Sequence, residues 1–249
     1  QGYPKPFVVV LAASAALLEA LIPPSNAAIL FSALTNVPVS QTFAAGIVPG
    51  LILLLFMIGV VLLKCRSIKS AAKSSTQERL ISAKNAVPAL ITPGIILGGI
   101  YAGLLTPSES AAIAGVWAMI MGFIIYRELT ISGLITCLKE TASITAVIFA
   151  IIATATFLSV VLTYTQLPQK IILYFTELGA GIYVFWFALA LICLILGTFI
   201  EIVPVFYLTV PIFAAIITSL NQNLLHLYVV FVAFAGIGMI TPPVCVGVY

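Results

Sequence analysis

The amino-acid sequence predicts an all-α polytopic membrane protein, and two features of its composition lead to this prediction. Hydrophobic residues make up 63% of the 249 residues, and charged residues make up 7%. A soluble domain carries about 25% charged residues, so a soluble fold of this size would leave too much apolar surface in water. A membrane-spanning helix needs roughly 20 apolar residues, which gives this chain room for about seven or eight full or partial spans.

The first apolar segment is interrupted by proline, and an ordinary span follows it. Apolar residues cover positions 7–21, stop at the Ile-Pro-Pro-Ser-Asn of positions 22–26, and resume to position 34. After a second break at positions 35–38, an uninterrupted apolar span covers positions 43–63.

Most of the positive charge lies in the loop at positions 64–85, which we expect to be cytoplasmic because short loops rich in Lys and Arg stay on that side. The loop is either simply solvated or binds lipid headgroups, and its positions 70–85 are compatible with an amphipathic surface helix. It holds six of the ten basic residues: Lys64, Arg66, Lys69, Lys73, Arg79 and Lys84.

The middle of the chain continues with a segment rich in Pro and Gly. Positions 87–105 are predicted to be irregular, because proline removes a backbone donor and glycine weakens a helix. Thr-Pro-Ser-Glu at positions 106–109 has the residue types of a helix start, with Glu109 as its cap. A span over 110–126, a second cytoplasmic loop over 127–140 and a span over 141–162 are expected to follow.

The last part of the chain alternates apolar segments with polar interruptions. After a break at positions 166–170, apolar residues cover positions 183–196 and continue past positions 197–201 to position 219. A polar turn then leads to a final apolar run over positions 224–240, directly before Pro242 and Pro243.

Two places in the chain look alike and indicate a function. Positions 20–25 read Ala-Leu-Ile-Pro-Pro-Ser, and positions 239–244 read Met-Ile-Thr-Pro-Pro-Val. Two consecutive prolines leave carbonyls of the preceding turn without donors, which is costly in hydrocarbon unless water or a bound cation replaces the lost bonds. Paired broken helices in two halves of a chain mark the midplane site of a secondary transporter. Kinks that serve packing alone are the alternative interpretation.

Glu201 is a second indication of function. It lies in a long apolar stretch, after Gly197 and Thr198, and a carboxylate in mid-membrane costs about 3 kcal/mol on insertion scales. The pattern predicts the tip of a re-entrant hairpin near 197–204; a glutamate at the membrane surface between two ordinary helices is the alternative. Glu19 is either a site residue or an interfacial residue.

The residues needed for enzyme chemistry are scarce. The chain has one histidine, no aspartate, and four cysteines without metal-ligand or redox spacing. We therefore expect no enzymatic activity and no organic cofactor. There is also no basic face with interleaved aromatic residues, so no nucleic-acid partner is expected.

The order and spacing of nine short segments resemble the large membrane (M) subunit of tripartite ATP-independent periplasmic (TRAP) transporters. The chain departs from the family pattern at Glu19-Ala20, where Gly-Pro is usual, at Glu201-Ile202-Val203, where Asp-Gly-Thr is frequent, and at Cys245, where Gly is usual. The resemblance extends over the whole chain and rests on positions 2–4, 21–25, 45–50, 93–100, 105–112, 126–129, 197–201, 211–212 and 238–244.

The resemblance implies an elevator-type transporter of the bacterial inner membrane, built from inverted repeats with re-entrant hairpins and broken helices. Sodium ions drive such a transporter, a periplasmic substrate-binding protein delivers the substrate, and a small four-helix membrane subunit accompanies it. Positions 1–63 would end the first repeat, 64–85 form the cytoplasmic basic loop, 86–140 supply scaffold and connections, and 141–249 form the second repeat, broken near 241. The first hairpin and the end of the second broken helix would then be missing from this sequence.

From this resemblance and the helix breaks we derive a hypothesis for the sites. One sodium ion would bind near Ser25 and the carbonyls ahead of Pro23. A second would bind where the hairpin tip meets the second break, and the anion would lie between the breaks. The second sodium site would use Gly197, Thr198, Gly238 and Thr241, with Glu201 orienting the tip, and the substrate contacts would be Ser25, Asn26, Thr241 and Val244.

The function implied is sodium-coupled uptake of small organic anions such as C4-dicarboxylates or sialic acid. Two alternatives stay open: a stand-alone ion-coupled anion carrier of the same superfamily, and a membrane scaffold subunit that transports nothing.

Overall fold

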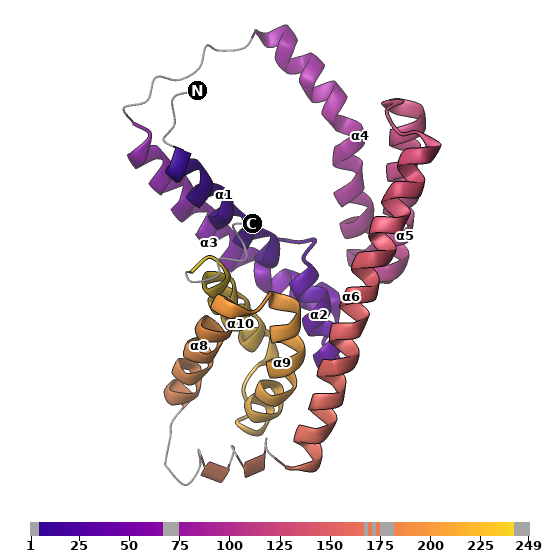
Figure 1. Cartoon of the computed structure of the whole chain (residues 1–249). Coiled ribbons are helices and arrows are strands. Elements are labelled where there is room, and N and C mark those ends of the chain that lie inside the picture. The colour runs from indigo at the N-terminus through magenta and orange to yellow at the C-terminus, as the bar shows by residue number, and fades with distance from the viewer. Residues whose placement is uncertain (1–4, 67–74, 167–168, 171–172, 175–181, 242–249) are drawn as a thin grey trace. The chain divides into compact units, whose positions relative to one another are not determined.

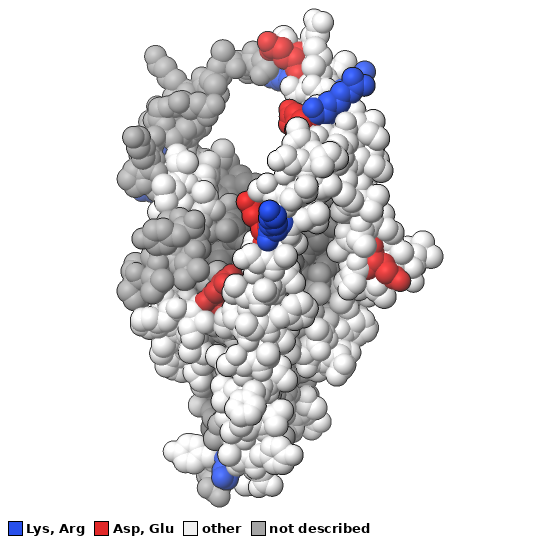
Figure 2. Space-filling model, turned by 45° about the vertical axis from the view of Figure 1, so that its right-hand side comes forward, with Lys and Arg blue, Asp and Glu red and all other residues white. Residues whose placement is uncertain are grey.

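The structure, a computed structural model, describes residues 5–66, 75–166, 169–170, 173–174 and 182–241. All regular elements in these ranges are helices, and seven of them are long and apolar enough to cross a membrane (Figure 1). The predicted class of all-α polytopic membrane protein is confirmed. Figure 2 shows the matching surface, on which uncharged side chains occupy most of the visible face and the charges are few and scattered.

The helices separate into two compact units by their internal contacts. Unit 1 contains residues 1–2 and 65–147, and unit 2 contains residues 3–64 and 148–249. The long helix α6 (Ile131–Tyr164) begins in unit 1 and ends in unit 2.

Unit 1 is built around an antiparallel pair, α4 (Thr76–Tyr101) and α5 (Pro107–Ile120), and a short π-helix, η1 (Met121–Ile125), continues α5. The prediction of an irregular segment over 87–105 is wrong, because α4 is continuous to Tyr101 through both of its prolines. Trp117 donates its indole N–H to the Pro88 carbonyl at 2.9 Å, and Tyr126 donates its hydroxyl to the Asn85 carbonyl at 3.0 Å. These bonds tie α5 and η1 to α4, whereas the carbonyls that Pro88 and Pro93 leave without helical donors are those of Lys84 and Ala89.

The helix start predicted at positions 106–109 is confirmed. Thr106 accepts a hydrogen bond from the Glu109 N–H at 3.3 Å, and the Glu109 carboxylate accepts one from the Thr106 N–H at 2.7 Å. This reciprocal capping box satisfies two donors that the first turn of α5 would otherwise leave unpaired. The loop predicted over 127–140 is shorter than expected, because α6 already begins at Ile131.

Unit 2 combines the N-terminal segment, residues 3–64, with the C-terminal segment, residues 148–249. Its helix α10 lies at the centre and touches α1, α2, α3, α8 and α9. The last turn of α8 lies beside the last turn of α10, and α9 returns antiparallel after a two-residue link. The helices of this unit are α1 (Lys5–Leu21), α2 (Asn26–Thr35), α3 (Val39–Lys64), α8 (Ile182–Phe199), α9 (Ile202–Ser219) and α10 (Leu224–Met239).

Aromatic side chains fill the space around α10. The Phe206 and Phe231 rings pack edge to face with their centroids 4.7 Å apart, and the rings of Phe31 and Tyr228 lie 5.3 Å apart. All four side chains are fully buried. Because lipid tails are as apolar as these side chains, close packing rather than hydrophobicity holds such helices together.

Glycine allows α3 to cross the broken end of α1 at backbone contact. A Cβ atom on Gly46 would lie 2.1 Å from the Leu21 carbonyl oxygen, and one on Gly50 would lie 2.6 Å from Cγ1 of Ile22. The two glycines are four residues apart and therefore lie on one face of α3. This is the small-xxx-small pattern of close helix pairs in membranes.

A second glycine contact joins the ends of α8 and α10. A Cβ atom on Gly197 would lie 2.6 Å from the Ala235 carbonyl oxygen and 3.0 Å from Cα of Gly238. A Cβ atom on Gly238 would lie 2.8 Å from the Leu194 carbonyl oxygen. The two helix backbones therefore touch without intervening side chains.

The first prediction concerns Gly46. Gly46→Ala forces a methyl group against a backbone oxygen that has no rotamer to change, so we expect a loss of about 1–3 kcal/mol in stability. Thermal unfolding of the purified full-length protein in detergent measures it. Gly59→Ala in the same helix is the control, because a Cβ atom there meets nothing within 4 Å. Equal melting temperatures for the two variants would contradict the close crossing.

The second prediction concerns Gly238. Gly238→Ala separates α10 from α8, and we expect a lower melting temperature and faster proteolysis of the α8–α9 hairpin than in Gly59→Ala. Limited proteolysis followed by mass spectrometry locates the cleavage. Cleavage at wild-type rate within residues 195–203 would show that the glycine contact does not hold the hairpin.

Candidate functional site

The first candidate site is the interruption between α1 and α2. Helix α1 ends at Leu21, α2 begins at Asn26, and both lie within one apolar segment long enough to span the membrane. The peptide bond between Pro23 and Pro24 is cis. Helix α2 has ten residues and is therefore about 15 Å long. That length is half of the roughly 30 Å hydrocarbon thickness of a bilayer, so an α2 that ends at the membrane surface would have the break near mid-membrane.

The carbonyl of Ala20 receives new donors in place of the one it loses. In a regular helix its donor would be the N–H of Pro24, which proline lacks. Two side-chain hydroxyls replace it: Ser25 Oγ donates to the Ala20 oxygen at 2.7 Å, and the Tyr228 hydroxyl donates at 2.9 Å. A carbonyl has two lone pairs, so the two donors saturate this oxygen.

Ser25 also starts the next helix. Its backbone is extended, with φ −121° and ψ 123°, and its Oγ accepts a hydrogen bond from the Ala28 N–H at 3.3 Å. The side chain is 1% exposed. One hydroxyl therefore closes α1 as a donor and caps α2 as an acceptor.

Glu19 and Asn26 face each other across the break. The Asn26 amide donates to the Glu19 carboxylate at 3.3 Å, and both side chains are exposed. The main-chain carbonyl of Glu19 loses its helical donor because position 23 is proline, and no donor from the residues that the structure describes reaches it. The break therefore presents a carboxylate and a free carbonyl oxygen together, which favours a cation over an anion at this point.

The second candidate site is the turn between α8 and α9. The two helices are joined by Ile200 and Glu201 alone, and each is an 18-residue helix that is long and apolar enough to cross a membrane. Glu201 is exposed, occupies the N-cap position of α9 and makes no capping bond with its side chain. A carboxylate at this position faces the partial positive charge of the helix N-terminus. Thr198 is half-buried and donates its hydroxyl to the Ile195 carbonyl at 2.7 Å.

The end of α10 lies beside this turn. Gly197 and Gly238, which the sequence grouped in one site, are in backbone contact. Thr241 follows the last turn of α10 and donates its hydroxyl to the Ile237 carbonyl at 2.7 Å. The hydroxyl protons of Thr198 and Thr241 are thus both used within their own helices, and their lone pairs are left to coordinate a cation. Val244 and the Pro242-Pro243 pair lie outside the described residues.

The two candidate sites are separate in this structure. Within the described ranges, no hydrogen bond joins the group around Ser25 to the group around Thr241, and α10 is the helix that reaches both. In the same ranges, no three His, Cys, Asp or Glu side chains gather. A cation held at either site would therefore depend largely on carbonyl and hydroxyl oxygens, which are ligands for hard ions.

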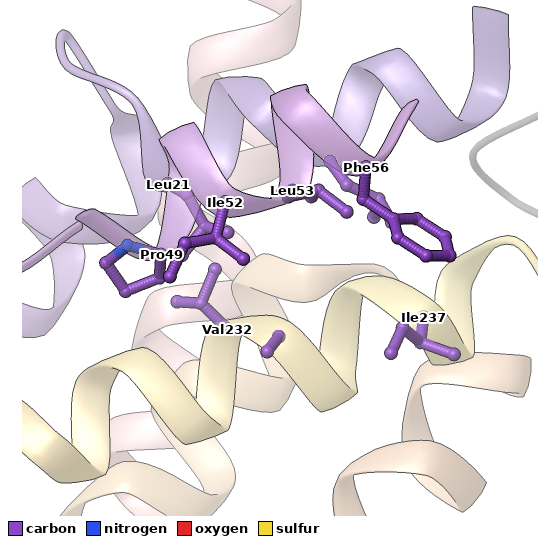
Figure 3. Close-up of a pocket in the computed structure, with 9 residues that line it drawn as sticks. Leu21, Pro49, Ile52, Leu53, Phe56, Val232 and Ile237 are labelled. Carbon is purple, nitrogen blue, oxygen red and sulfur yellow. The ribbon is translucent and has the colours of Figure 1, made fainter. Parts of the chain in front are cut away.

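A large apolar cavity in unit 2 does not have the chemistry of an anion site. It has a volume of about 400 Å³ and lies between α1, α3 and α10. Figure 3 shows Ile52, Leu53 and Phe56 of α3 facing Val232 and Ile237 of α10 across it. A site for a polar ligand needs a few convergent polar groups, and each of the nine lining side chains is hydrocarbon.

Sequence reasoning missed one member of the first site, Tyr228. The Ala20 oxygen is among the carbonyls ahead of Pro23, whereas Tyr228 looks like one more aromatic residue in an apolar run. A tyrosine hydroxyl buried in a membrane helix needs a hydrogen-bond partner, so the sequence indicated that Tyr228 has one without identifying it. The partner itself lies 208 positions away in the chain, so only the structure identifies it.

Comparison with known proteins identifies the family of the chain. A family model described as "Tripartite ATP-independent periplasmic transporter, DctM component" matches residues 1–249. The chain is 37% identical to the C4-dicarboxylate TRAP transporter large permease protein DctM of Pseudomonas aeruginosa, over 98% of this chain and 57% of the relative.

Two further relatives carry other substrate names. The sialic acid TRAP transporter large permease protein SiaM of Vibrio cholerae is 32% identical, over 96% of this chain and 56% of its own length. The ectoine TRAP transporter large permease protein TeaC of Halomonas elongata is 30% identical, over 97% of this chain and 57% of its own length. The chain thus spans somewhat more than half the length of these relatives. It belongs to the DctM component family of tripartite ATP-independent periplasmic transporters, which are multi-pass proteins of the bacterial inner membrane.

Proposed function

We propose that this chain contributes to sodium-coupled uptake of small organic anions, as part of the large membrane subunit of a TRAP transporter. The observation that carries the proposal is the family match over residues 1–249. The broken helix inside an apolar span supports it, because discontinuous helices are where secondary transporters bind substrate and coupling ion.

In this proposal, the first sodium ion binds at the α1–α2 break. The free carbonyl of Glu19, the Ala20 carbonyl ahead of Pro23 and the remaining lone pair of Ser25 supply oxygen ligands. Because Ser25 and Tyr228 already occupy the Ala20 oxygen, a bound ion displaces one of these donors or uses the other oxygens. The nearby Glu19 carboxylate adds attraction for the cation.

A second sodium ion binds where the hairpin tip meets the end of α10. The ligands are the lone pairs of Thr198 and Thr241 and main-chain oxygens near Gly197 and Gly238. The backbone contact between the two glycines supports this assignment, since it brings both chain segments within reach of one ion. Glu201 orients the tip from the N-terminus of α9.

The substrate is an anion that binds between the two breaks, at half-helix N-termini with partial positive charge. Asn26, Ser25 and Thr241 are its candidate amide and hydroxyl contacts, together with Val244. C4-dicarboxylates and sialic acid, which appear in the names of two relatives, are the substrate classes that we propose. The sodium ions would offset the charge of Glu19 before the anion arrives.

The transport cycle we propose is an elevator movement in which the broken helices and the α8–α9 hairpin carry ion and anion together. The proposed partners are a periplasmic substrate-binding protein and a small four-helix membrane subunit. A stand-alone carrier is the second candidate, and its uptake would not change when the periplasmic protein is added. A scaffold subunit would produce no substrate-stimulated sodium flux.

The third prediction concerns the sodium ligands. In proteoliposomes with the full-length protein and its partners, Ser25→Ala and Thr241→Ala should each raise the half-saturating sodium concentration about three- to tenfold, as the loss of one hard ligand worth about 1 kcal/mol implies. Uptake of labelled succinate or sialic acid against sodium concentration measures the effect.

Thr218→Ala is the matched control for these variants. Its hydroxyl makes the same kind of bond, to the Ala214 carbonyl at 2.7 Å, but it lies at the opposite end of α9 from the hairpin tip. Unchanged sodium dependence in both Ser25→Ala and Thr241→Ala would remove the assignment of the two sites.

A further inference from the structure

The hydrogen bond from Tyr228 to Ala20 is the feature that the proposed function leaves unexplained. It links α10 to the broken end of α1 at 2.9 Å, across 208 positions of sequence. The oxygen that it reaches is the one that Pro24 deprives of its helical donor, so the contact replaces a bond that the helix cannot make.

The tyrosine ring has little freedom to move away. It is fully buried, and its ring lies 5.3 Å from that of Phe31 on α2. Its neighbours Leu227, Phe231 and Val232 are buried as well. Because the ring packs against α2 and the hydroxyl bonds the end of α1, the tyrosine fixes where the Ala20 oxygen points.

Ser25 shares this oxygen, which connects the tyrosine to the proposed ion ligands. The Ser25 hydroxyl donates to Ala20 at 2.7 Å. If the tyrosine donor is removed, Ser25 alone satisfies the carbonyl and its proton is held there more firmly. With the Ala20 oxygen saturated by both donors, a cation at the break uses the Glu19 carbonyl and the Ser25 hydroxyl oxygen, whose positions depend on this pair of bonds.

Helix α10, whose position Tyr228 constrains at the first site, also contacts the second candidate site. Gly236 packs against Leu17 of α1, and Gly238 packs against Gly197 at the hairpin. Tyr228 lies ten positions before Gly238, which corresponds to about 15 Å along the helix. A change in the register of α10 against α1 therefore moves the backbone at both sites.

We propose that Tyr228 is a positioning residue for sodium binding: its hydroxyl orients the Ala20 carbonyl at the first break and sets the register of α10, which carries the second site. The inference rests on the proposed function. Tyr228 need not touch ion or substrate; it acts through Ala20 and through the helix on which it lies. The expected consequence is a change in sodium affinity that exceeds any change in the amount of folded protein.

The experiment is a sodium titration of the purified full-length protein, read as a rise in melting temperature with NaCl and compared with KCl. A ligand that binds the folded state stabilises it in proportion to ln(1 + [L]/Kd), so the titration yields an apparent affinity without the partner proteins. Tyr228→Phe removes only the hydroxyl, and we expect the apparent sodium affinity to fall about three- to tenfold.

Tyr207→Phe on α9 is the matched control, because the Tyr207 hydroxyl bonds no residue in the described part of the chain. It should bind sodium as the wild type does. The double variant Ser25→Ala, Tyr228→Phe should lose less affinity than the sum of the single variants, because both act on one carbonyl.

The outcomes separate the inference from the proposed function. A wild-type protein that sodium does not stabilise beyond potassium contradicts the sodium coupling itself. If sodium stabilises the wild type and the apparent sodium affinity of Tyr228→Phe is unchanged, the positioning role alone is overturned. This holds even if the variant melts at a lower temperature without sodium. A lower apparent sodium affinity in Tyr228→Phe but not in Tyr207→Phe supports the positioning role.

Discussion

The bilayer obliges every main-chain oxygen within it to find a donor inside the protein, and this constraint organises the first candidate site. Two prolines after α1 remove the donors for Glu19 and Ala20. The Ala20 oxygen is restored by one hydroxyl from the adjacent residue of the break and one from a helix far away in sequence. The broken helix therefore depends on α10 for one of the two donors to its Ala20 oxygen. The break and α10 form one structural element.

Glycine provides the second half of this arrangement. At both candidate sites, helices meet backbone to backbone, at Gly46 against Leu21 and at Gly197 against Gly238. Close approach of this kind adds dispersion contacts where the hydrophobic effect between helices is absent. It also brings main-chain oxygens of different helices near one another, which a layer of larger side chains would prevent.

The sequence was sufficient for the class of the fold and for most helix boundaries, because long apolar runs and proline breaks are local signals. It failed at α4, where Pro88 predicted irregularity and the structure has a regular helix. Trp117 of α5 donates to the Pro88 carbonyl there, a contact between helices that no local pattern around Pro88 indicates. Ser25 was recognisable from its place beside two prolines, whereas Tyr228 was not, because its role depends on a contact between distant segments.

The grouping of Gly197 with Gly238 was predicted from similarity of pattern, and their contact is in the structure. Whether these residues bind an ion depends, in contrast, on which oxygen lone pairs are not already used by hydrogen-bond donors. The sequence does not show which lone pairs these are. Thr198 and Thr241 illustrate the point, since each satisfies its own helix through its proton and keeps its acceptor capacity free. Val244 and the second proline pair lie outside the described residues.

The contact between Gly46 and Leu21 also has an evolutionary consequence. A Cβ atom at position 46 would meet main-chain atoms of Leu21, so no change of side chain at position 21 would relieve the clash. Residue 46 therefore has almost no alternative to glycine. The Leu21 side chain is itself buried, so both partners of this crossing resist substitution.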